Sequence, residues 1–127
     1  IGYYDSAPGS QDYPYPAMSW LYPDRGDFIA VVGRMQDINA VRQVKAALLS
    51  SRDLSVYSMN APGFIPGIDF SDHLNYWQHD IPAVMITDTA FYRNKQYHLP
   101  GDTADRLNYQ KMAQVVDGVI TLLQNSK

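Results

Sequence analysis

Hydrophobic and polar positions follow two different periods along this chain, and together they predict three strands and three helices. Continuous or alternating apolar residues predict strands over Asp27–Arg34, Leu54–Asn60 and Ala83–Thr87. Apolar residues at helical spacing predict helices over Asp37–Ser51, Ser71–His79 and Tyr109–Gln124. Strands that alternate with helices in this order predict an α/β fold, with helices packed on the faces of a sheet.

The helices are expected to pack through apolar stripes. The stripe of the first predicted helix is formed by Ile38, Val41, Val44 and Leu48. The stripe of the last one is the clearest in the chain and is formed by Met112, Val115, Val116, Val119, Ile120 and Leu123. Asp37 and Ser71 precede two helices and are expected to act as N-caps. A change of Val116 to Asp should therefore bury an unpaired charge.

Two loops are expected to form a binding edge. In open α/β sheets, ligands gather at the carboxyl ends of the strands. The loops Ala61–Asp69 and Asp88–Thr103 both follow predicted strands, so we expect them to meet at one edge of the sheet. Ile1–Tyr4 resembles the tail of a further strand that could contribute to the same edge.

The segment Asp5–Gly26 is a long loop that alternates four prolines with aromatic residues. Proline prevents a regular hydrogen-bonded ladder, and loops of this length are usually functional or disordered. The aromatic residues favour an ordered loop that packs over the surface of the protein.

Composition narrows the function classes. The chain has 127 residues, of which 46% are hydrophobic, as expected for one globular domain with a core. A net charge of -3 without a basic block argues against a nucleic-acid surface. The absence of Cys excludes thiolate catalysis and disulfides. No apolar stretch approaches the roughly 20 residues that span a bilayer. We expect a soluble protein, and the compartment stays open, export included.

His98 is the residue that points most directly to chemistry. An imidazole on a loop after a strand is well placed to bind a metal, although a hydrogen-bonded or solvated histidine is the alternative. One imidazole cannot hold a catalytic zinc by itself. The run Ser71-Asp72-His73 resembles a hydrolase triad, but neighbours in a helix do not face each other. Aromatic residues on the two loops suit either an apolar pocket or ordinary core.

A string of short motifs adds to this interpretation. In order, the chain contains Phe70-Ser71-Asp72-His73, Ile81-Pro82-Ala83, Thr87-Asp88, Arg93-Asn94, Tyr97-His98 and Asp102-Thr103. This order and spacing closely resemble the C-terminal half of the co-catalytic di-zinc aminopeptidases, metallopeptidase family twenty-eight. The start Ile1-Gly2-Tyr3-Tyr4-Asp5 is similar to the segment after an acidic metal ligand of that family.

The resemblance implies part of a three-layer α/β/α sandwich on a mixed sheet, with residues 1–127 as one domain that forms the C-terminal half of a larger peptidase domain. It also implies two zinc ions in the complete enzyme, of which this chain would supply one ligand, His98. Asp102 and Thr103 would anchor the His98 loop by capping the following turn. The pocket for an apolar N-terminal side chain would be lined by Ile68, Phe70, Met85, Phe91 and Tyr97. Arg93 would either pair with a substrate carboxylate or brace the loop.

We therefore expect the parent protein to be a zinc-dependent exopeptidase that removes N-terminal residues from peptides. The isolated chain should be inactive and should not bind zinc stably, because it lacks the catalytic Glu and the other ligands. Its partners would be a peptide substrate and the missing N-terminal half of the domain. The alternative is a non-catalytic binding module of the same fold. A His-x-Asp, a separate Asp and a Glu-Glu pair upstream of Ile1 would favour the peptidase.

Overall fold

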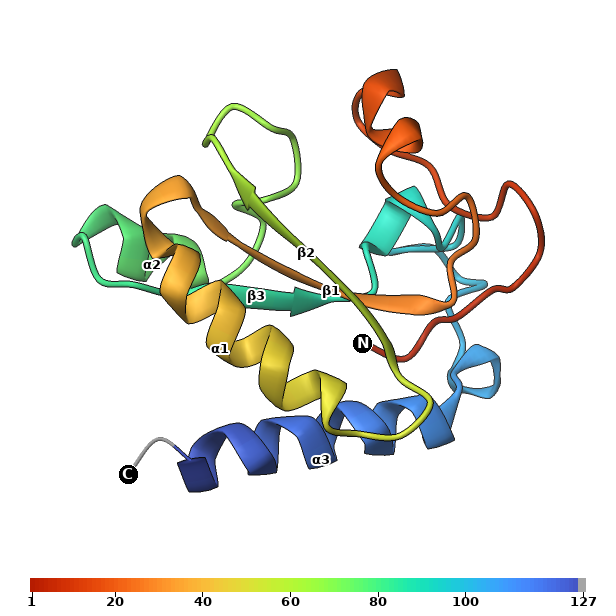
Figure 1. Ribbon diagram of the computed structural model, residues 1–127. Helices are drawn as coiled ribbons and strands as arrows, with labels where there is room; N and C mark the ends of the chain where they lie inside the picture. Colours follow the sequence, from red (N-terminus) through yellow and green to blue (C-terminus); the bar gives the residue numbers. More distant parts are fainter. Residues whose placement is uncertain (126–127) are drawn as a thin grey trace.

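Figure 1 shows the computed structural model of the protein, which describes residues 1–125. Its strands are β1 (Phe28–Arg34), β2 (Ser55–Ala61) and β3 (Val84–Thr87), and its α-helices are α1 (Ile38–Leu49), α2 (His73–Gln78) and α3 (Tyr109–Asn125). Short 3-10 helices add η1 (Pro16–Trp20), η2 (Met35–Asp37), η3 (Ala90–Tyr92) and η4 (Ala104–Arg106). Each predicted strand and helix is present within two residues of its expected ends.

The strands form one mixed sheet in the order β2-β1-β3. The central strand β1 pairs with β2 in parallel and with β3 antiparallel. Ala30 lies in the middle of the sheet, opposite Tyr57 of β2 and Thr87 of β3. The predicted α/β fold with a mixed sheet is confirmed.

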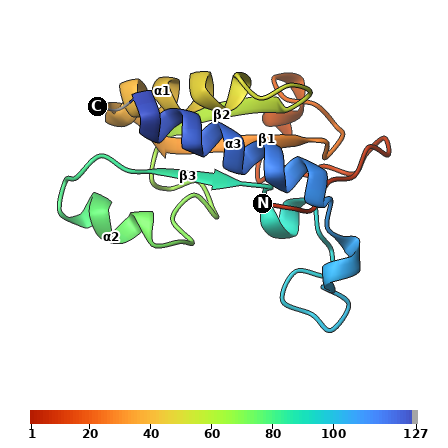
Figure 2. The same ribbon diagram turned by 90° about the horizontal axis from the view of Figure 1, so that it is seen from below.

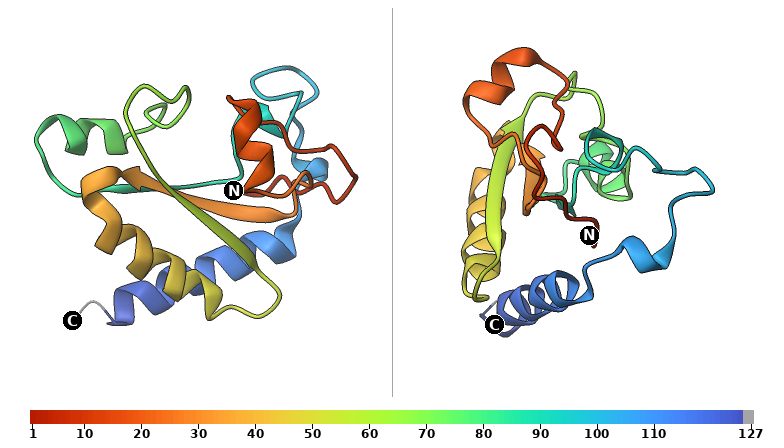
Figure 3. Two further views of the ribbon diagram at one scale, coloured as in Figure 1. Left: turned by 45° about the horizontal axis from the view of Figure 1, so that its top comes forward. Right: turned by 90° about the vertical axis from the view of Figure 1, so that its right-hand side faces the viewer.

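The sheet lies between two layers, as Figures 2 and 3 show. On one face α1 and α3 lie side by side, and this core contains the buried side chains of Ile29, Val31, Val41, Val44, Leu48, Leu54, Val56 and Val115. On the other face lie α2 and the loop before it, and a second cluster is formed by Val32, Ala61 and Ile68. Side-chain alternation along β1 produces this division, because odd-numbered residues face the helices and even-numbered residues face the loops.

The expectation that two loops leave the sheet at one edge is wrong. Because β3 is antiparallel to β1 and β2, the loops that follow β2 and β3 start from opposite ends of the sheet. The two loops still meet, because residues 62–72 fold back over the sheet face. The hydroxyl of Tyr92 donates a hydrogen bond of 3.3 Å to the carbonyl oxygen of Pro66. The meeting point is therefore the face of the sheet.

The expected stripe of α3 is correct on one side only. Val115 is buried at 2% exposure, whereas Val116, Ile120 and Leu123 are 50%, 46% and 66% exposed. The helix contacts α1 and the sheet through Val115, Gly118 and Val119. A Cβ on Gly118 would lie 2.8 Å from the Cα of Leu48, so glycine permits the close approach of the two helices. Ile38, at the start of α1, is also exposed, at 40%.

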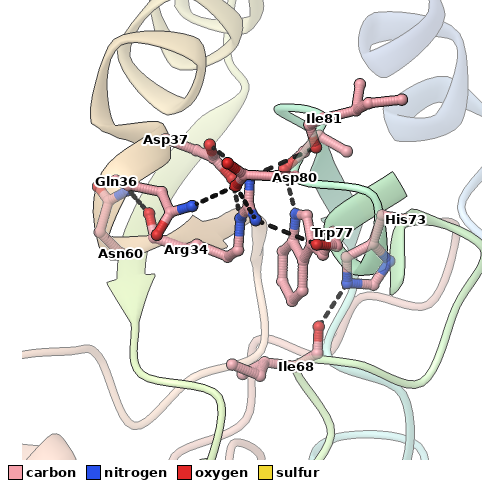
Figure 4. Close-up of polar contacts among 10 residues, drawn as sticks. Arg34, Gln36, Asp37, Asn60, Ile68, His73, Trp77, Asp80 and Ile81 are labelled. Atoms are coloured by element: carbon pink, nitrogen blue, oxygen red, sulfur yellow. Dashed lines mark hydrogen bonds and ion pairs between the residues drawn. The ribbon is translucent and has the colours of Figure 1, made fainter. Parts of the chain in front are cut away.

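Neither predicted N-cap forms a side-chain cap. Helix α2 begins after Asp72 rather than Ser71, and no side chain caps α1 or α2. The buried carboxylate of Asp37 instead accepts hydrogen bonds of 2.7 and 3.1 Å from Arg34. As Figure 4 shows, Arg34 also reaches Asp80 and the carbonyl oxygen of Trp77. This cluster joins the start of α1 to the turn after α2.

Residues 1–4 are not a strand, contrary to expectation. The only bridge of this region within residues 1–125 joins Asp5 to Gly26. The backbone N–H groups of Gly2 and Tyr3 donate to the carboxylate of Asp88 at 2.9 and 3.0 Å. A side chain therefore takes the hydrogen bonds that a strand neighbour would have taken. No helix within residues 1–125 is long and apolar enough to cross a membrane.

Candidate functional site

A cavity of about 280 Å³ opens on the sheet face that is opposite α1 and α3. Its floor is formed by alternate residues of all three strands, namely Phe28, Ala30, Val32, Tyr57, Met59, Met85 and Thr87. The period of two along each strand places these side chains on one face. Residues of strands that are distant in sequence thus make one apolar surface.

Three loops form the walls. The segment before α2 contributes Ile65, Pro66, Ile68 and Phe70, and the segment after β3 contributes Phe91, Tyr92 and Tyr97. The predicted pocket residues Ile68, Phe70, Met85, Phe91 and Tyr97 all line this cavity. Their contact with a substrate remains a prediction.

The third wall was not identified from sequence. It is formed by Tyr13, Pro14, Met18 and Tyr22 of the long proline-rich loop. The loop is ordered, as predicted, and η1 lies within it. The alternation of prolines with aromatic residues in the sequence was the available signal for this wall, because a solvated linker is usually poor in aromatic side chains. Six floor residues were also missed, and the period of two along their strands could have identified them: Phe28, Ala30, Val32, Tyr57, Met59 and Thr87.

Three tyrosines of the cavity, Tyr13, Tyr22 and Tyr92, donate their hydroxyl groups to backbone carbonyls. Tyr13 donates to Pro23 at 2.6 Å, and Tyr22 donates to Ser58 at 3.1 Å. Burial raises the pKa of Tyr13 to about 12, so the phenol stays neutral near pH 7.

Within the described residues no Lys or Arg lines the cavity. Two carboxylates do line it, but Asp12 pairs with Lys95 and Asp88 accepts from the backbone N–H groups of Gly2 and Tyr3. The remaining lining is mainly apolar and aromatic, which suits an apolar group.

A buried histidine fixes the wall at Ile68. His73 is 7% exposed, and its Nε2–H donates to the carbonyl oxygen of Ile68, as Figure 4 shows. The edge of the His73 ring packs against Trp77, with ring centroids 4.4 Å apart. Trp77 in turn donates from Nε1 to the carbonyl oxygen of Ala83 at 2.9 Å. His73 thus belongs to the support of the cavity, and no triad forms with Ser71.

His98 lies beside the cavity. Its exposed imidazole stacks on the ring of Tyr97, with centroids 3.9 Å apart, and Tyr97 itself lines the cavity. The backbone at His98 has a φ of +59°, which is the left-handed region. Residues 1–125 contain no group of three or more acidic or histidine side chains that could hold a metal. Two histidines are exposed, His79 and His98, and of these only His98 stacks on a residue that lines the cavity.

The His98 loop is anchored through Asn94. Asn94 is buried, and its Nδ2 donates to the carboxylate of Asp102 at 2.8 Å. Its Oδ1 accepts from the backbone N–H of Gln96 at 3.0 Å and from Arg106 at 3.1 Å. The predicted cap is absent, because Thr103 makes no side-chain cap on η4. Asp102 anchors the loop from its other end, by a contact across the loop.

Arg93 lies outside the cavity and under the loops. It is 2% exposed, and its guanidinium donates to Gln11 Oε1, to the Tyr3 carbonyl and to the Phe28 carbonyl at 2.9 to 3.0 Å. The guanidinium carbon also lies 4.6 Å from the centre of the Phe28 ring. Burial lowers the pKa of Arg93, although nearby Asp88 favours the charged form. These contacts match the loop-bracing alternative rather than a role in binding a substrate carboxylate.

Comparison with known proteins identifies the family. The family model of Peptidase family M28 matches residues 24–123. The chain belongs to this family. The resemblance to the family that the motifs indicated is confirmed, and membership of the family supports a peptidase-like function. The family is generally zinc-dependent, and His98 falls within the matched residues.

The chain is also 95% identical over 127 residues to an uncharacterized protein, YfbL, of Escherichia coli strain K12. The match covers the whole chain, but the chain spans only 39% of the length of that protein. No solved structure matches the chain.

Proposed function

We propose that the complete protein is a zinc-dependent aminopeptidase and that this chain supplies one zinc ligand, His98, and the pocket for the N-terminal side chain of a peptide. The single observation that supports this most strongly is the position of His98. Its ring stacks on Tyr97, and Tyr97 lines an apolar cavity. A side chain held in the cavity would place the adjacent peptide group near the imidazole.

The residues of this chain have separate tasks in this proposal. The cavity binds an apolar side chain and excludes water from it. Asn94 and Asp102 hold the loop that presents His98. Zinc, when bound, supplies Lewis-acid polarisation of a carbonyl group. The catalytic Glu and the remaining ligands would come from the part of the protein that lies outside this chain.

The partner of this chain would then be the remainder of its own domain. The relative YfbL extends well beyond the matched 127 residues. Two surfaces support contact with such a remainder. The stripe of Val116, Ile120 and Leu123 on α3 is exposed, and β3 pairs with β1 along one edge only within the described residues. An unpaired edge strand beside an apolar helix face is a surface on which further sheet and helix can pack.

The proposal is tested in the complete protein by the change His98→Ala. We expect loss of about one zinc per molecule and of most aminopeptidase activity, with the fold retained, because His98 is on an exposed loop. Asp102→Ala should reduce zinc affinity or activity less, by roughly 10–100-fold, because it acts through the loop. His79→Ala is the matched control, since His79 is exposed and lies outside the cavity. Zinc content and the hydrolysis of aminoacyl anilides are the measurements.

Equal zinc content in the wild type and in His98→Ala would reject the ligand assignment. A greater loss of zinc in Asp102→Ala than in His98→Ala would reverse the two roles. A wild-type protein that binds peptides but hydrolyses none in the presence of zinc would favour the non-catalytic binding module instead.

A further inference from the structure

The floor of the cavity has two rows of side chains that differ in size. One row runs Met59, Val32, Met85 across the three strands, and the next runs Tyr57, Ala30, Thr87. All six residues line the cavity. In the second row the central strand contributes only a methyl group, so the floor is lowest at Ala30.

The neighbours of Ala30 do not fill this space. The ring of Tyr57 packs edge-on against Phe28, with centroids 5.0 Å apart, and against Tyr22 at 6.1 Å. The hydroxyl of Thr87 accepts a hydrogen bond of 3.0 Å from the backbone N–H of Thr89. Both side chains are therefore held by other contacts. Ala30 is only half-buried although it lies on the central strand, where Ile29 and Val31 on the opposite face are fully buried.

We propose that Ala30 is a specificity-determining residue: it sets the depth of the cavity, so that the protein prefers large apolar or aromatic N-terminal side chains over small ones. This inference rests on the proposed aminopeptidase function. The cavity of about 280 Å³ has room for a ring or a branched chain. An Ala side chain in the substrate would leave most of this apolar surface uncovered and would lose the corresponding binding energy.

The experiment uses the complete, zinc-loaded protein and three variants. Ala30→Val adds two methyl groups at the floor and suits a strand. Ala30→Gly removes one methyl group and deepens the floor. Ser55→Val is the control, because it makes a comparable addition on β2 at an exposed position outside the cavity. The measured quantity is the ratio of kcat/KM for phenylalanyl anilide to that for alanyl anilide.

The wild type should favour the phenylalanyl substrate. In Ala30→Val the ratio should fall by about 10-fold or more, since one methylene in an apolar pocket discriminates by roughly 10–200-fold. The fall should come from the phenylalanyl substrate, with alanyl turnover retained as evidence of an intact site. Ala30→Gly should keep or raise the ratio, and Ser55→Val should leave it unchanged.

A ratio that stays at the wild-type value in Ala30→Val, while alanyl turnover persists, overturns the assignment of Ala30. If Ala30→Val does not fold, Ala30→Gly provides the test. A fall in its ratio of phenylalanyl to alanyl kcat/KM would overturn the assignment. A wild-type preference for the alanyl substrate also overturns it. Absence of hydrolysis of any anilide by the zinc-loaded wild type overturns the proposed function itself, which is a separate result.

Discussion

At the scale of the residue, Arg93 lies on a loop but connects several distant segments of the chain. Its guanidinium is buried and donates to a side-chain amide and to two backbone carbonyls, none of which bears a negative charge. The three acceptors belong to segments near residues 3, 11 and 28, which are far apart in the sequence. Arg93 therefore ties the start of the chain and the long loop to β1.

Arg93→Met should lower the free energy of unfolding by about 2–4 kcal/mol, because the buried acceptors lose their donors while the apolar stem is kept. Urea unfolding at pH 7 measures the change. Arg42→Met on the exposed side of α1 is the control and should change little. Unchanged stability of Arg93→Met would revive a role for Arg93 in binding substrate.

Asp88 is a second residue whose role depends on distant partners. Burial raises the pKa of Asp88, but hydrogen bonds from the backbone N–H groups of Tyr3 and Ala90 lower it, and the pKa lies below its ordinary value of 3.8. A carboxylate whose pKa is lower in the folded state than in the unfolded chain stabilises the folded state at pH values above its pKa in the unfolded chain. This stabilisation is lost as the pH falls through the pKa of the folded state.

Asp88→Asn should therefore cost about 1–2 kcal/mol at pH 7, and the difference from wild type should shrink below about pH 4. Urea unfolding at pH 7 and at pH 3 gives both values. Asp117→Asn, at an exposed position on α3, serves as the control. A difference between wild type and Asp88→Asn that is the same at both pH values would contradict the proposed charge effect.

At the scale of the element, α3 has two apolar faces with different partners. Val115 packs into the core beneath the sheet, and Gly118 allows contact with Leu48 of α1. Val116, Ile120 and Leu123 lie on the other face and are exposed in this chain. A helix that is apolar on more than one side is typical of a helix that is covered on both.

The two faces can be separated by one substitution on each. Val115→Asp should destabilise the isolated chain by about 3–5 kcal/mol, because it buries an unpaired charge. Val116→Asp should change its stability by no more than about 0.5 kcal/mol. Thermal or urea unfolding of both variants checks this. Equal losses in the two variants would mean that α3 is rotated from the orientation described here.

At the scale of the whole molecule, the chain is a layered α/β unit with an apolar cavity and, beside it, the imidazole of His98. Residues 1–125 hold no cluster of potential metal ligands, and the chain spans 39% of the length of the relative YfbL. In the proposed function, this unit would bind and position the side chain of a substrate. The parts that carry out hydrolysis would lie elsewhere in the protein.

The isolated chain should accordingly not hydrolyse aminoacyl anilides, with or without added zinc, because one imidazole binds zinc weakly and no catalytic Glu is present. The complete protein, assayed in the same buffer, is the positive control. Zinc-dependent turnover by a chain whose mass is verified as that of 127 residues would contradict the division of roles proposed here.

The sequence by itself determined the main helices and strands and the family, because both depend on local patterns. Apolar periodicity placed the three α-helices and three strands within two residues of their ends, and the order of short motifs from Phe70 to Thr103 was sufficient to indicate the family. Such patterns are formed by residues that are close together in the sequence, so the patterns can be recognised without knowledge of distant contacts.

Only the tertiary structure decided how these elements face one another. The direction of β3 depends on how the strands pair. Because β3 is antiparallel to β1, the two loops meet over the face of the sheet and not at the expected edge. The faces of α3 depend on where α1 lies, and the burial of Arg93 depends on segments up to 90 residues away. Non-local contacts of this kind leave no period in the sequence. For that reason the low floor at Ala30, between Tyr57 and Thr87, became visible only when the three strands were aligned.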